Sequence, residues 1–366
     1  MADPKAVALF KDLVDRVLAR PEVMLAGGMV GIAVLLGFRR TLTKKSVGTL
    51  LALLAVAFFA FSVTDPDFRK IVTKADNVPI AAMIFLVGFF TWVAVRKMTF
   101  NDEAVRRGEP TFEARETKTR VFVWPDLVYS ELICLVVLTV VLILWSVALP
   151  APLEEPASPS RTPNPSKAPW YFLGLQELLI YYDPWIAGVL VPGFIIVGLM
   201  AVPYLDRNPR GNGYFTFSER PFAISFFLFG FLVLWLIPIL IGTFLRGPNQ
   251  ALFGPYERWD PHKVQAIVNV NVSDLFWIRF LGKPLPSEWY VREAPGLLLA
   301  AGYLFVLPPL LARTIFRKFY SGMGAARFGV FVFFFLTALA VPIKEVCRWT
   351  FNLKYVVNIT EYFFNI

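Results

Sequence analysis

The residues best suited to chemistry lie in one short stretch, PSKAPWYFLGLQELL, which occupies residues 165–179 between two apolar runs. Trp170 and Tyr171 adjoin in it, and the carboxylate of Glu177 follows six residues after Tyr171. A helix over 172–181 would surround Glu177 with apolar neighbours, and a carboxyl group so placed is readily protonated near neutral pH. The stretch therefore predicts reversible proton transfer at Glu177. The alternative, that Glu177 faces headgroup water and has no chemical role, stays open.

Other candidate residues give weaker signals. His262 is the one histidine of the chain, and it lacks the second imidazole that a haem or metal site needs, so we expect a surface or structural role. Cys134 and Cys347 form no C-x-x-C pair, and we interpret both as packing residues. Glu131 lies about one turn into an apolar run, where a charge is costly, so it could be functional or could pair with a neighbouring subunit. No motif for nucleotide binding or hydrolysis appears.

The composition indicates which helices hold these residues in place. Hydrophobic residues make up 57% of the chain and fall in blocks long enough to cross a bilayer. We predict an all-α, polytopic membrane protein with about eight transmembrane helices. An amphipathic helix over residues 5–20 precedes them, and no cleavage site of a signal peptide follows. The expected spans cover residues 22–38, 46–63, 78–95, 126–149, 184–203, 222–243, 294–312 and 327–344.

The net charge of +9 indicates orientation and lipid contacts rather than nucleic-acid binding, because the basic residues crowd into loops beside apolar runs. The loop 150–183, by contrast, carries only Arg161 and Lys167, so we predict that it and the loop 244–293 lie on the outer side. The N-terminal helix then also lies outside, against the rule. Three short segments dense in Lys and Arg should lie in the cytoplasm: residues 39–45, 96–120 and 313–327.

The chain divides into three parts without an internal repeat. Residues 1–120 hold the amphipathic helix and three spans, and residues 121–245 hold three more spans and the Trp-Tyr loop. Residues 246–366 hold a long loop, two spans and an aromatic tail. Within the loop 150–168, six prolines predict an extended surface connector.

The middle part resembles the C-terminal half of cytochrome b and subunit IV of the cytochrome b6f complex. In that family a span, a proline-rich outer loop ending in Pro-Glu-Trp-Tyr, a short helix, a second span, a loop ending in Arg-Pro and a third span follow one another. Here the first loop ends in Trp170-Tyr171, and a second loop runs from Pro203-Tyr204-Leu205-Asp206-Arg207-Asn208-Pro209 to Arg220-Pro221. A second Glu-Trp-Tyr, at residues 288–290, lacks the following helix and is interpreted as an interfacial anchor.

The resemblance implies part of an outer quinol-oxidation site. Ala168-Pro169 stands where the family has Pro-Glu, so the glutamate that resembles a proton acceptor is missing, and Glu177 is the natural substitute. Glu177 and Tyr171 are therefore the expected catalytic residues. The expected quinol-binding residues are Pro169, Trp170, Tyr171, Leu173 and Leu175.

The resemblance also implies partners in the inner membrane of a bacterium. A cytochrome b6-like subunit would hold the b haems, a Rieske protein the iron-sulfur cluster, and a c-type cytochrome would carry electrons onward, in a complex that is a dimer with bound lipids. The quinol would be menaquinol or ubiquinol, and this chain would bind no metal and no covalent cofactor. Two other readings stay open: the membrane anchor of another quinone-linked oxidoreductase, and a transporter or scaffold, although transporter-like repeats are not evident.

Overall fold

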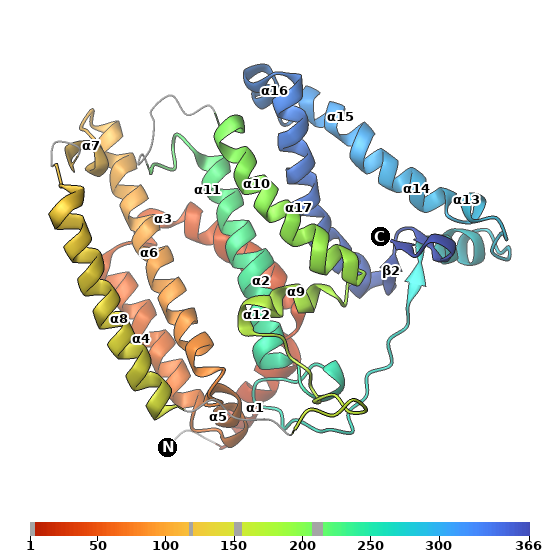
Figure 1. Cartoon of the computed structure of the whole chain (residues 1–366), viewed down its shortest axis with the longest axis horizontal. Coiled ribbons are helices and arrows are strands. Elements are labelled where there is room, and N and C mark those ends of the chain that lie inside the picture. The colour runs from red at the N-terminus through yellow and green to blue at the C-terminus, as the bar shows by residue number, and fades with distance from the viewer. Residues whose placement is uncertain (1–3, 117–119, 150–155, 207–214) are drawn as a thin grey trace.

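The computed structural model describes residues 4–116, 120–149, 156–206 and 215–366 and confirms an all-α membrane architecture (Figure 1). Within those residues, seven continuous helical segments are long and apolar enough to cross a membrane. The eighth predicted span is α2, which is joined to α1 and its π-helical extension at an angle of 86°. The seven segments are Lys45–Ser62, Val78–Arg106, Val123–Ala148, Ile186–Leu205, Pro221–Leu245, Ala294–Arg313 and Ala325–Phe351.

The helices follow the predicted order, and prolines mark many of their starts because proline fits the first turn of a helix. π-helical turns at 14–18, 123–127, 186–190, 229–236, 241–245 and 302–306 extend or join several helices, and a further one covers 274–280. Short 3-10 turns lie at 170–172, 248–250 and 360–362. The α-helices are α1 Pro4–Leu13, α2 Pro21–Gly37, α3 Arg39–Leu42, α4 Lys45–Ser62, α5 Pro66–Val72, α6 Val78–Arg106, α7 Phe112–Glu116, α8 Val128–Ala148, α9 Leu173–Leu178, α10 Val191–Leu205, α11 Pro221–Leu228, α12 Ile237–Leu240, α13 Trp289–Arg292, α14 Ala294–Ala301, α15 Leu307–Arg313, α16 Arg317–Met323 and α17 Ala325–Phe351.

Two helices run further than the sequence pattern indicated. The third span was expected to end at residue 95, but α6 continues to Arg106, and α17 continues to Phe351 rather than to residue 344. Both extensions carry polar residues that the fold buries, such as Asn101 and Glu345. The apolar sequence pattern ends where these polar residues begin, but the helical hydrogen bonds of the backbone continue through them.

A buried carboxylate joins the leading spans to the middle part of the chain. Asp102 of α6 is 6% exposed. One of its oxygens accepts hydrogen bonds from the Ser218 amide and hydroxyl at 3.0 and 2.9 Å, and the other lies 3.2 Å from Arg39 Nη2. Nearby, Asn101 donates to the Phe215 carbonyl at 3.1 Å. The helix α6 and the residue Arg39, which lies just after α2, are therefore attached to this chain's own middle part.

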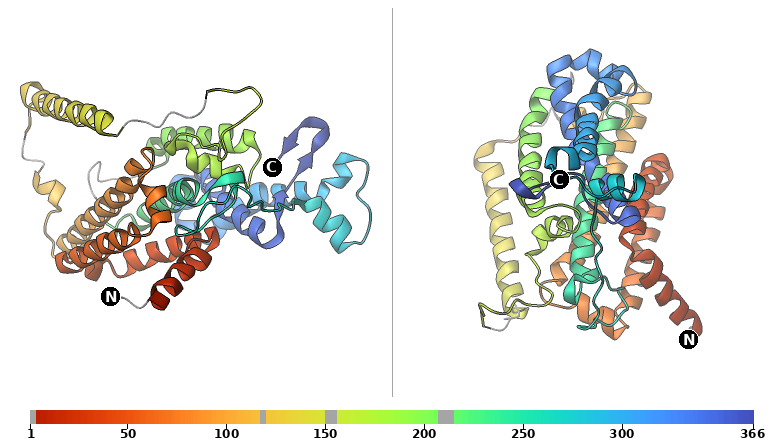
Figure 2. Two further views of the ribbon diagram at one scale, coloured as in Figure 1. Left: turned by 90° about the horizontal axis from the view of Figure 1, so that it is seen from below. Right: turned by 90° about the vertical axis from the view of Figure 1, so that its right-hand side faces the viewer.

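The span that contains α8 is not covered by the rest of the described chain. No residue of α8 is buried, and Figure 2 shows α8 standing apart from the other helices. Glu131 lies on this exposed helix. Since a lone apolar helix must be covered in the membrane, α8 presents a surface for lipid or for another protein. The proline-rich connector is exposed over residues 156–164, and its residues 150–155 lie outside the described part, as do Arg207 to Pro209.

The aromatic tail folds back instead of lying free at an interface. Strand β2, Leu353–Tyr355, pairs in parallel with β1, Val270–Asn271. Strands β3, Asn358–Ile359, and β4, Phe364–Asn365, form an antiparallel pair. The Trp185 indole donates to the Asn365 carbonyl at 3.0 Å. This hydrogen bond attaches the tail to the start of the span Ile186–Leu205, which contains α10. The tail therefore supports the segment that follows α9.

We expect Asp102→Ala to loosen the junction between the leading spans and the middle part. The substitution leaves Arg39 and the Ser218 groups without their acceptor, at a cost of about 1–3 kcal/mol in unfolding free energy. Thermal unfolding of the purified protein in detergent measures the effect. Glu103→Ala, at the adjacent but more exposed position, is the control; equal loss in both variants would contradict the role given to Asp102.

Candidate functional site

The Trp-Tyr stretch forms a 3-10 turn, Trp170–Phe172, that leads directly into α9, Leu173–Leu178. The expected helix over 172–181 is therefore shorter, and turn hydrogen bonds from Tyr181 and Tyr182 to the Leu178 carbonyl complete it. Gln176 closes the loop before α9: its side-chain oxygen accepts from the Ala168 amide at 2.7 Å, and its nitrogen donates to the Ser166 carbonyl at 2.8 Å. The loop conformation thus depends on a glutamine that the sequence did not single out.

The expected quinol-binding residues divide between two faces. Pro169, Trp170 and Tyr171 face outward, with Trp170 38% and Tyr171 49% exposed, and Phe172 is exposed beside them. The Trp170 and Tyr171 rings meet edge to face at 5.6 Å between centroids. Leu173 is buried. Leu175 packs against the cluster around Leu178, Tyr181 and Tyr182.

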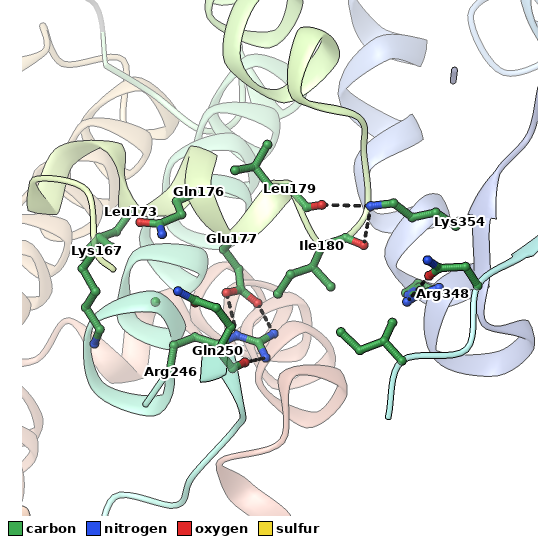
Figure 3. A pocket seen from close by; sticks show the side chains of 13 residues that line it. Lys167, Leu173, Gln176, Glu177, Leu179, Ile180, Arg246, Gln250, Arg348 and Lys354 are labelled. Carbon is green, nitrogen blue, oxygen red and sulfur yellow. Dashed lines mark hydrogen bonds and ion pairs between the residues drawn. The ribbon is translucent and has the colours of Figure 1, made fainter. Parts of the chain in front are cut away.

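Glu177 lies on the inner face, where it forms a buried ion pair. Its carboxylate meets the Arg246 guanidinium with two parallel contacts, Nη2 to Oε1 at 2.7 Å and Nε to Oε2 at 2.9 Å (Figure 3). The side chains of Glu177 and Arg246 are only 4% and 9% exposed. Both readings made from the sequence are wrong about these surroundings, because Glu177 faces neither headgroup water nor purely apolar neighbours.

Arg246 is the functional candidate that the sequence analysis missed. It follows the span Pro221–Leu245 directly and donates to the Gln250 carbonyl at 2.9 Å as well as to Glu177. A guanidinium fixed in two directions also fixes its partner, since the planar fork matches a carboxylate only in one orientation. A lone arginine at the end of a long apolar run was the available signal.

A cavity of about 360 Å³ opens beside this ion pair (Figure 3). Its walls carry Lys167, Arg348 and Lys354 besides Arg246, and Glu177 is the one carboxylate among its lining residues. Lys354 donates to the Leu179 and Ile180 carbonyls at 2.9 and 3.2 Å, so it caps the end of α9. Burial lowers the pKa of Lys167 to about 8, and its ammonium donates to the Thr243 carbonyl at 2.7 Å. The cavity therefore carries an excess of positive charge on a largely apolar lining, and Tyr171 does not line it.

The described residues offer little for metal or haem ligation. No group of three His, Cys, Asp or Glu side chains gathers among them. The His262 side chain is 88% exposed and lies beside Asp260. Cys134 is exposed on α8 and Cys347 is half-buried in α17.

The Arg-Pro motif has a structural role. Pro221 begins α11, and the preceding Arg220 pairs with Asp206 at 2.6 Å. Asp206 ends α10, so this ion pair joins the two ends of the loop that connects α10 to α11. Two motifs that the sequence analysis placed at the ends of one loop, the segment beginning at Pro203 and Arg220-Pro221, are thus joined by the ion pair between Asp206 and Arg220.

Comparisons with known proteins agree with these features over part of the chain. The family model described as cytochrome b (C-terminal)/b6/petD matches residues 156–244. A protein of Geobacillus thermodenitrificans named menaquinol:cytochrome c reductase cytochrome c subunit is 34% identical over 116 residues, which is 30% of this chain and 44% of that protein. The match thus spans less than half of the relative's length. No solved structure matches. Residues 156–244 therefore carry the segment characteristic of the cytochrome b C-terminal/b6/petD family, as their resemblance predicted.

Proposed function

We propose that this chain is a subunit of a bc-type quinol:cytochrome c oxidoreductase and forms one wall of its outer quinol-oxidation site. The observation that carries the proposal is the exposed aromatic turn Trp170–Phe172, which lies inside the family segment and faces away from the chain's own core. Exposed rings at the end of a membrane span favour an apolar, aromatic ligand or a partner surface. The relative's name favours menaquinol as the substrate.

The haems of such a complex would belong to a partner. A b-type haem with two imidazole ligands needs two histidines, and this chain has one. A cytochrome b6-like subunit would cover the exposed surface of α8 and complete the quinol pocket opposite the aromatic turn. A Rieske iron-sulfur protein would take the first electron and a c-type cytochrome would carry it onward, with lipids around a dimeric complex.

The orientation of the molecule is part of the proposal. Helices α3, α7 and α16, which belong to the basic segments, lie toward the upper end in Figure 1, while the loop before α9 and the loop after Leu245 lie toward the lower end. Since basic segments stay in the cytoplasm, this arrangement supports an outer, periplasmic position of the aromatic turn in a bacterial inner membrane.

The proposed chemistry divides between the two faces of α9. Tyr171, with Pro169 and Trp170, contacts the quinol ring on the outer face, while Leu173 and Leu175 hold α9 from inside. Glu177 accepts a proton that the quinol releases on oxidation and passes it outward through the adjoining cavity. Because Arg246 occupies both carboxylate oxygens, at least one of these contacts must open when Glu177 takes the proton.

We expect Tyr171→Leu to weaken quinol oxidation by about tenfold in kcat/KM, because the loss of ring contacts worth about 1.4 kcal/mol corresponds to that factor. Quinol-dependent reduction of cytochrome c by the purified complex measures it, and the haem content should not change. Tyr320→Leu, on the cytoplasmic side in the proposed orientation, is the control. Unchanged kinetics of Tyr171→Leu would refute the contact.

Glu177→Gln should slow quinol oxidation by about 10²-fold, the lower end of what a positioned proton acceptor contributes, and should alter its pH dependence. Gln keeps the size of Glu but cannot take up a proton. Arg246→Gln is the comparison, because it breaks the same ion pair and leaves the carboxylate in place. If the two variants lose activity equally with unchanged pH profiles, Glu177 has only a structural role.

A further inference from the structure

The cavity beside the buried ion pair carries more positive charge than the chain itself neutralises. Its lining includes four cations, and Glu177, its one carboxylate, is engaged by Arg246. Three cations are left: Lys167, Arg348 and Lys354. None of the three forms an ion pair with a carboxylate in the part of the chain that the structure describes. The cavity therefore has the charge of an anion-binding site.

Lys167 is held in place by groups that carry no charge. Its ammonium donates to the Thr243 carbonyl at 2.7 Å and lies 4.9 Å from the centroid of the Trp259 ring. An ammonium has three N–H groups, so one hydrogen bond to protein leaves donors for a ligand. These contacts fix the position of the charge at the cavity wall without compensating it.

Arg348 and Lys354 likewise contact only neutral oxygens on the other side of the cavity. Arg348 donates to the Asn352 carbonyl at 2.8 Å and to the Asn269 side-chain oxygen at 2.9 Å. All printed hydrogen bonds of Lys354 go to backbone carbonyls at and beyond the end of α9. Figure 3 shows Lys167 on one side of the buried ion pair and these two cations on the other. The cavity thus has cations on opposite walls.

Burial without an anion weakens the charged form of these groups. It lowers the pKa of Lys167 to about 8. It also lowers the pKa of Lys354, and the neighbouring charge of Arg348 adds to that effect, against the opposing charge of Asp183. An anion in the cavity would relieve both effects.

The cavity lies where membrane spans end. Gly242 and Arg246 line it from the end of the span Pro221–Leu245, and Arg348 lies in the last turn of the span Ala325–Phe351. Because the ends of spans lie at the bilayer surface, the cavity is at the depth of the lipid headgroups. The commonest anion at that depth is the phosphate of a phospholipid.

The lining also suits a lipid better than a free ion. Leu179, Ile180 and Ile267 add apolar surface beside the cations, and Ile267 is 66% exposed. The volume of about 360 Å³ is near the lower end of the range for small-molecule sites, about 300–1,000 Å³. Such a cavity can admit a headgroup and the first methylenes of its chains, whereas inorganic phosphate would leave the apolar wall unused.

We propose that this cavity binds the headgroup of one anionic phospholipid, whose phosphate is held by Lys167, Arg348 and Lys354. The glycerol and the first methylenes contact the apolar wall that includes Ile267. The surplus of positive charge favours a headgroup with a net negative charge over a zwitterionic one. The site consists of this chain's own residues and does not rest on the function proposed above.

Native mass spectrometry of the full chain, purified in mild detergent, tests the proposal by titration with phosphatidylglycerol, phosphatidylethanolamine or inorganic phosphate. We expect one phosphatidylglycerol to bind about fivefold more tightly than phosphatidylethanolamine, the factor that corresponds to about 1 kcal/mol. Equal affinity for the two lipids would overturn the proposal. Inorganic phosphate that displaces phosphatidylglycerol at equal concentration would overturn the assignment to a lipid.

Lys167→Met should weaken the binding of phosphatidylglycerol about fivefold, because it removes one cation and keeps the length of the side chain. Lys263→Met is the matched control. Lys263 also donates to a backbone carbonyl, that of Leu252, and lies over an aromatic ring, that of Phe253. It differs in being paired with Glu257 and in not lining the cavity. Equal weakening in both variants would contradict a local site.

Ile267→Glu gives a second test at an exposed position, where the substitution leaves the core intact. The new carboxylate should compete for the cations of the cavity and abolish the preference for phosphatidylglycerol, whereas Ile267→Gln, of similar size, should keep it. Thermal unfolding without added lipid checks that each variant is folded. If Lys167→Met and Ile267→Glu both bind phosphatidylglycerol as the wild type does, the cavity is not the lipid site.

Discussion

The ion pair between Glu177 and Arg246 is the interaction on which the candidate site depends. It joins α9 to the end of the span Pro221–Leu245 across 69 residues of sequence, in a position where neither side chain meets bulk water. A buried pair of this kind adds little net stability, but removing one partner leaves an unpaired charge at a cost of about 3–5 kcal/mol. The pair therefore fixes the rotation of α9, and with it which residues face outward.

That rotation separates two surfaces with different chemistry. The outer surface presents Trp170, Tyr171 and Phe172, which are exposed rings that contact one another. The inner surface contains the ion pair and the positively charged cavity. In a bc-type complex the first surface would receive the quinol and the second would handle its protons.

Much of this architecture could be predicted from sequence, because membrane spans are set by hydrophobicity over about 20 residues. The number and order of the spans, the N-terminal helix and the position of the Trp-Tyr loop all agree with the structure. The pairing of Glu177 with Arg246 could not be predicted, since it depends on how α9 turns relative to a distant span end. The polar extensions of α6 and α17 were missed for a related reason: Asp102 and Glu345 are buried by tertiary contacts that no local pattern reveals.

We propose that this chain works within a haem-containing quinol oxidoreductase. The most direct test is to isolate the tagged chain from native membranes under mild detergent and to record its redox difference spectrum after addition of menaquinol. We expect b-type haem from a partner subunit to copurify and to be reduced by the quinol. A preparation that retains its partners but contains no quinol-reducible b haem would contradict the proposal.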